Sequence, residues 1–134
     1  MTGSRRRGDR GTLAIEVVLL TPALVAILML MLGGYRVTKA RSEVESAAQD
    51  AARTYSLTLS QQQAQDAAEA ALQDAGLTCR NPGVDTGGSD PTPGGTAVVR
   101  VTCTVALSDL AFIPAGDLTF SSTARAPIDP FRAS

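Results

Sequence analysis

The sequence has 134 residues, a formal net charge of −1, two cysteines and no histidine. This length allows one small domain, and the lack of histidine excludes Ser-His-Asp and Cys-His catalytic groups. No basic patch with interleaved aromatic residues occurs, so nucleic-acid binding is not predicted. Two cysteines without histidine are a poor metal-ligand set, and we expect neither a cofactor nor an enzyme.

Residues 1–11 are polar and basic, with four arginines among the first ten residues, and read as a short disordered cytoplasmic tail. Arginines just before an apolar run favour a cytoplasmic N-terminus by the positive-inside rule. Three basic residues at positions 36, 39 and 41 flank the other end of the run and weaken this preference.

Residues 12–35 are predicted to form a transmembrane helix. Glu16 is the only charged residue near its start, and residues 17–32 contain no ionisable group. As a helix this segment is about 36 Å long, enough to cross a hydrocarbon core of about 30 Å.

The helical pattern continues after Gly33 and Gly34, which predicts one long helix from about residue 13 to residue 57. Apolar residues recur at three- and four-residue steps along its second half, at Val37, Ala40, Val44, Ala47, Ala51 and Tyr55. This narrow, alanine-rich stripe buries little area per residue, so it needs a partner surface.

A second helix is predicted over residues 61–75. Ser60 and Gln63 resemble a capping box, and Gly76 stands where a left-handed C-terminal residue belongs. Its apolar face comprises Ala64, Ala67, Ala68, Ala71, Leu72 and Ala75. The two helices would form an extracytoplasmic helical hairpin over residues 36–76.

Residues 77–134 are predicted to be a small β region. Residues 96–107 and 117–126 alternate between apolar and polar side chains, and residues 77–80 read as a further short strand. Residues 81–95, rich in glycine and proline, read as a mobile loop. Residues 108–116 form a connection that carries Leu110, Phe112 and Ile113. The fold class is therefore α+β, with two or three antiparallel strands and one face against the helices.

Cys79 and Cys103 enclose the glycine- and proline-rich loop. If the apolar segment exports the residues C-terminal to it, both cysteines lie where a disulfide can form, and we favour a bridge between them. The alternative is two unpaired apolar cysteines.

Glu16 needs an explanation, because a carboxylate near the bilayer centre costs about 2.5–3.5 kcal/mol. A simple account places it at headgroup depth in the first helical turn, where the helix dipole favours a negative charge. A cleaved secretory signal lacks a convincing A-x-A site here, and a twin-arginine signal fits poorly because Gly-Asp follows the arginines.

The start of the apolar segment, Gly11-Thr12-Leu13-Ala14-Ile15-Glu16, resembles the type III signal of type IV pilins and pseudopilins. That signal is a basic leader ending in glycine, followed by an apolar segment with glutamate at the fifth mature position. The spacing is similar to the TadE-like branch of tight-adherence (Flp) pilus systems, which the chain also resembles at Pro22, Gly33-Gly34 and the Ala/Arg-rich stretch 47–53. Thr21 is a polar departure from that pattern, and its hydroxyl is able to bond back to the helix backbone.

The resemblance implies a membrane-held minor pilin, cut between Gly11 and Thr12 by a prepilin peptidase on the cytoplasmic side. Residues 1–11 would then be its basic leader peptide. Glu16 would neutralise the new amine of Thr12 in its own or a neighbouring subunit during assembly. The implied partners are the peptidase, other pilin or pseudopilin subunits, the assembly machinery and membrane lipid. The alternative is an uncleaved single-pass protein whose extracytoplasmic domain binds a partner.

Overall fold

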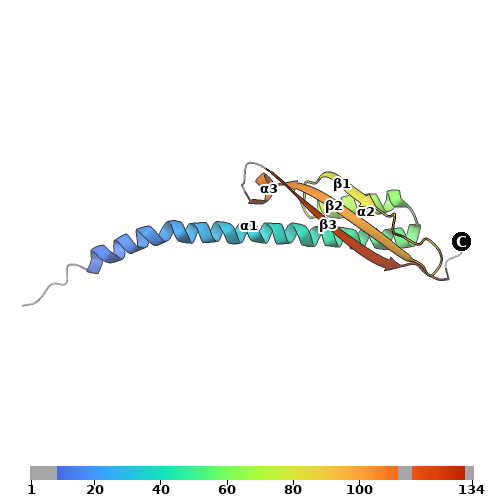
Figure 1. The fold of residues 1–134 in the computed structure, drawn as a ribbon, viewed down its shortest axis with the longest axis horizontal. Coiled ribbons are helices and arrows are strands. Elements are labelled where there is room, and N and C mark those ends of the chain that lie inside the picture. Colours follow the sequence, from blue (N-terminus) through green and yellow to red (C-terminus); the bar gives the residue numbers. More distant parts are fainter. Residues whose placement is uncertain (1–8, 112–115, 132–134) are drawn as a thin grey trace, which may run out of the picture. The chain divides into compact units, whose positions relative to one another are not determined.

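The computed structural model describes residues 9–111 and 116–131. Three helices, α1 (Asp9–Thr58), α2 (Gln61–Asp74) and α3 (Leu107–Ala111), accompany three strands, β1 (Arg80–Asp85), β2 (Thr96–Ala106) and β3 (Asp117–Pro127). Figure 1 shows α2 and the strands alongside the C-terminal part of α1. The predicted α+β class, with one long helix, one short helix and a small antiparallel sheet, is confirmed.

The chain divides into two compact units, residues 1–35 and residues 36–134, and α1 contributes to both. The division lies between Tyr35 and Arg36, one residue after the Gly33-Gly34 pair. Helix α1 begins at Asp9, four residues before the predicted start, and no proline interrupts it between residue 9 and residue 13. Most of the predicted leader, residues 1–8, lies outside the described residues.

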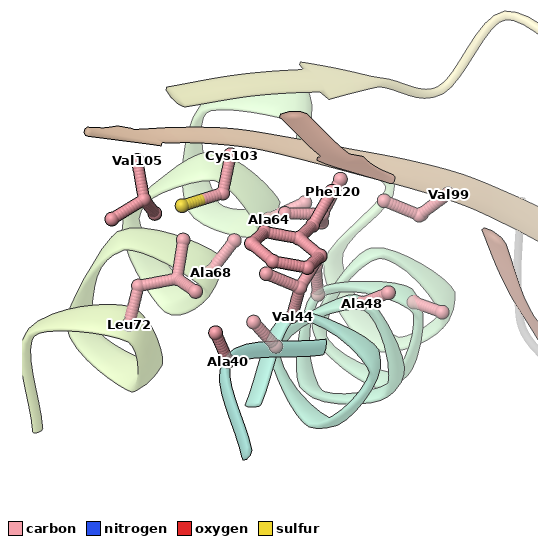
Figure 2. Packing of buried hydrophobic residues seen from close by; sticks show 14 of the residues in the cluster. Ala40, Val44, Ala48, Ala64, Ala68, Leu72, Val99, Cys103, Val105 and Phe120 are labelled. Carbon is pink, nitrogen blue, oxygen red and sulfur yellow. The ribbon is translucent and has the colours of Figure 1, made fainter. Parts of the chain in front are cut away.

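One hydrophobic core holds the second unit together, and it joins all of its major elements. The predicted stripe of α1 lies in it, with four residues buried and Val37 and Tyr55 partly buried. Figure 2 shows the sheet lying over both helices, with Phe120 pointing from β3 toward them. The fully buried members are mostly small, and they include Ala40, Ala47, Ala48, Ala51, Ala64, Ala68, Val99, Val101 and Cys103. The stripe therefore finds its partner surface within the chain.

The ends of α2 are as the sequence predicts. Ser60 is the N-cap, and its hydroxyl oxygen accepts a hydrogen bond from the Gln63 backbone N–H at 3.3 Å. Gly76 has a φ of +75°, and the N–H of Leu77 donates to the Leu72 carbonyl at 3.0 Å. This pair of features is a Schellman motif, which requires a left-handed residue that glycine adopts without strain.

The sheet is antiparallel in the order β1-β2-β3. Strands β2 and β3 match their predicted ranges to within one residue, but the prediction for β1 is wrong. The strand occupies residues 80–85, part of the predicted loop, instead of residues 77–80. An irregularity between Arg80 and Gly83, with Asn81 at a φ of +52°, lets the edge strand accommodate Pro82.

The remaining connection between β1 and β2 is held by short hydrogen bonds. The Ser89 hydroxyl both accepts from the Val98 N–H and donates to the Val98 carbonyl, each at 2.9 Å. The Thr92 hydroxyl and backbone N–H donate to Asp90 Oδ1 and hold the pKa of that carboxyl below its usual value. Leu110 is buried in α3, whereas Phe112 and Ile113 lie outside the described residues.

Candidate processing and assembly site

The first unit presents an apolar helix that nothing in the described chain covers. Its large apolar side chains between Leu13 and Leu32 are 47% to 76% exposed. The helix segment Leu13–Thr58 contains an 18-residue window of mean hydropathy 2.6, none of it buried. One N-terminal helix is thus long and apolar enough to span a membrane, which is consistent with a single-pass membrane protein.

Gly11 and Thr12 lie near the beginning of α1, within its first two turns. A Cβ atom placed on Gly11 would meet no other atom within 4 Å, so packing does not require glycine there. Glycine in a helix is about 1 kcal/mol less favourable than alanine. Gly11 therefore weakens the helix at the position of the predicted cut, and no packing reason for it is present among the described residues.

Glu16 is exposed and lies four residues after Thr12, one helical turn along α1. The neighbouring polar departure, Thr21, donates its hydroxyl to the Val17 carbonyl at 2.7 Å. That bond satisfies the hydroxyl within the helix, as the sequence suggests. Pro22 lies inside α1 and lacks a backbone N–H, so the Val18 carbonyl loses its usual helical donor.

Cys79 and Cys103 form a disulfide with a sequence separation of 24 residues. Cys103 lies in β2 with its side chain in the core, and Cys79 directly precedes β1. The bridge joins the start of the edge strand to the middle strand. Sequence reasoning identifies the pair, but it does not place the bridge beneath the sheet.

A groove that sequence reasoning misses runs between α1 and β3. It has a volume of about 590 Å³ and is lined by Glu45, Gln49, Arg53, Ser56 and Leu57 of α1 together with residues 122–127 of β3. The polar residues at positions 45, 49 and 53 recur at helical spacing, which is visible in the sequence. The sequence does not show that β3 lies opposite them.

Comparison with protein families matches residues 11–53 to the family described as TadE-like protein. The matched segment is about a third of the chain, begins at Gly11 and includes Glu16. Comparisons with curated proteins and with solved structures return no match. The resemblance to the TadE-like family is therefore confirmed over residues 11–53, and it suggests a protein associated with the tight-adherence pilus.

Proposed function

We propose that the chain is a TadE-like minor pilin, or pseudopilin, that is processed by a prepilin peptidase and contributes to assembly of a tight-adherence pilus. The observation that carries this proposal is the family match beginning at Gly11. The exposed apolar helix supports it, because such a surface needs lipid before assembly and neighbouring helices afterwards. The second unit, residues 36–134, favours a minor role, since major pilins of this branch are much shorter.

The proposed cut lies between Gly11 and Thr12. A protease binds its substrate as an extended chain, so the first turns of α1 have to unwind before cleavage. The first four backbone N–H groups of a helix have no intrahelical acceptor, and Gly11 weakens the same turn. Unwinding at this end therefore disrupts few hydrogen bonds and leaves the core of the second unit untouched.

Cleavage would give Glu16 a charge partner. The new amine of Thr12 is one helical turn away along α1, and the helix N-terminus itself favours a nearby carboxylate. The amine of a neighbouring subunit is an equivalent partner. Pairing between subunits would offset the cost of placing Glu16 in the bilayer and would fix the axial position of one helix against the next.

The proposed topology places the N-terminus in the cytoplasm and the second unit outside. The disulfide between Cys79 and Cys103 supports an extracytoplasmic location for the second unit, because disulfides form and persist in oxidising compartments. The proposed partners are the prepilin peptidase, other pilin or pseudopilin subunits, the assembly machinery and membrane lipid.

Mass analysis of the membrane-extracted protein tests the proposal. A mature chain beginning at Thr12 is expected in cells that contain the peptidase. When the peptidase is deleted, a chain beginning at Met1, or at Thr2 after loss of the initiator methionine, is expected. A Gly11→Leu variant should also retain the leader, with Gly8→Leu as the control that is still cut. An intact N-terminus in peptidase-containing cells would contradict processing and favour an uncleaved single-pass protein with a partner-binding domain.

A further inference from the structure

The two edges of the sheet differ in how they are protected against pairing. The β1 edge is six residues long, contains Pro82 and has an irregular register. Strand β3 is eleven residues long, pairs with β2 without interruption, and has no lysine and no proline before its last residue. Soluble proteins usually protect long edge strands with such features, so β3 is an open edge and β1 is not.

The backbone groups on the β3 edge follow from the hydrogen bonds of β2. Both backbone groups of Val98 bond to the Ser89 hydroxyl, so Val98 and its register partner Arg125 do not bond each other. Hydrogen-bonded and non-hydrogen-bonded residue pairs alternate along an antiparallel pair of strands. All the β3 residues in step with Arg125 therefore direct their N–H and C=O groups away from β2, namely residues 117, 119, 121, 123 and 125. Among the described residues no backbone hydrogen bond reaches these groups from outside the sheet.

The groove between α1 and β3 lies on this same free side. Six consecutive β3 residues line it and no β2 residue does. Its charged residues are Arg53 and Arg125, opposed by Glu45 alone. A row of free backbone donors and acceptors accepts an extended chain, and two arginines against one carboxylate favour an acidic side chain on that chain.

A second copy of this protein fits the edge poorly. Antiparallel pairing of two β3 strands would reverse one copy of α1 relative to the other, because α1 and β3 run in the same general direction in Figure 1. Residues 36–58 of α1 are about 34 Å long, so the two chains would leave the pair at ends separated by about that distance. An antiparallel pair therefore suits two chains anchored in one membrane poorly. Pairing of β3 with β1 of another copy would require the protected edge.

We propose that β3 is a docking edge for an extended, acidic segment of a different protein, which adds a fourth strand to the sheet and places a carboxylate between Arg53 and Arg125. The inference rests on the second unit and on anchoring of the chain in a membrane, and it stands independently of processing at Gly11. An eleven-residue edge offers about 36 Å of strand, so even a segment of seven residues pairs along most of the groove.

The test measures binding of fluorescent peptides to the full-length protein in lipid nanodiscs, by fluorescence anisotropy. The probe is the acidic peptide TVTDTVT, and the lysine peptide TVTKTVT is its charge control. Two further forms of TVTDTVT carry N-methyl groups at alternate residues, one form at the odd positions and the other at the even positions. We expect the acidic peptide to bind about ten-fold more tightly than the lysine peptide. One of the two N-methylation patterns should abolish binding, because it removes the donors that face β3 while the other leaves them intact.

Protein variants locate the site. Ser121→Pro removes an N–H that faces the free edge and should weaken binding about ten-fold, whereas Ser121→Thr should not. Thr123→Pro, at a residue that lines the groove, serves the same purpose if Ser121→Pro lowers the urea midpoint of unfolding. Arg125→Glu should reverse the preference to the lysine peptide, while Lys39→Glu, an exposed residue of α1 outside the groove, should change affinity less than about two-fold.

Absence of binding at TVTDTVT concentrations up to about 1 mM would overturn the proposal, since a dissociation constant above about 1 mM is too weak for specific docking. Equal binding of the acidic peptide, the lysine peptide and both N-methylated peptides would also overturn it, as would binding that survives both Ser121→Pro and Arg125→Glu. Such a result has no bearing on the N-terminal mass, so failure here is distinguishable from failure of the proposed function.

Discussion

Removal of the disulfide by Cys79→Ser should destabilise the second unit by about 3.5 kcal/mol. The bridge closes a loop with a separation of 24 residues, and the loss of loop-closure entropy in the unfolded chain gives this magnitude. The variant keeps Cys103, which is fully buried and remains in place as a small apolar side chain. The change therefore removes the bridge and alters one half-buried side chain at the margin of the core.

Pulse proteolysis of the full chain in detergent, over a urea series, measures this loss. With a typical dependence on urea for a unit of this size, the midpoint should fall by about 2 M. Wild-type protein treated with dithiothreitol should show the same midpoint as Cys79→Ser, which controls for the serine itself. A decrease of the urea midpoint by less than about 0.5 M would refute the loop-entropy reasoning. It would mean that residual β1–β2 pairing already restricts the unfolded chain.

The other predictions concern helix packing, helix capping and assembly. Ala48→Leu should destabilise the second unit by about 2 kcal/mol, because Ala48 is fully buried in the core. Gln49→Leu, at the adjacent exposed position, should change the stability by less than about 0.5 kcal/mol. Equal urea midpoints for these two variants would contradict the packing shown in Figure 2. Ser60→Ala should cost about 1 kcal/mol by removing the N-cap of α2, and an unchanged midpoint would show that Ser60 does not stabilise the helix. Glu16→Ala should leave the N-terminal mass of the processed chain unchanged and reduce the number of pili seen by electron microscopy; normal piliation would exclude the charge-partner role.

The sequence is a good guide wherever local chemistry decides the structure. The stripe on α1, the Ser60 and Gly76 caps, and the alternation in β2 and β3 are all visible as spacing, because the helix and strand periods fix which side chains share a face. The glycine–glutamate spacing at residues 11 and 16 is likewise local, and it coincides with the family match. The cysteine pair is visible by elimination, since the chain has no other cysteine.

Tertiary structure decides the features that depend on which elements become neighbours. Strand β1 is irregular and contains Pro82, so only its pairing with β2 identifies it as a strand. The open edge of β3 exists because β2 bonds β1 on one side and β3 on the other, and the groove exists because α1 presents residues 45, 49 and 53 beside that edge. Periodicity indicates which side chains share a face of one helix or strand, but it does not indicate which other helix or strand packs against that face. The apolar helix and its glutamate are thus determined by sequence alone, whereas the docking edge is a product of the fold.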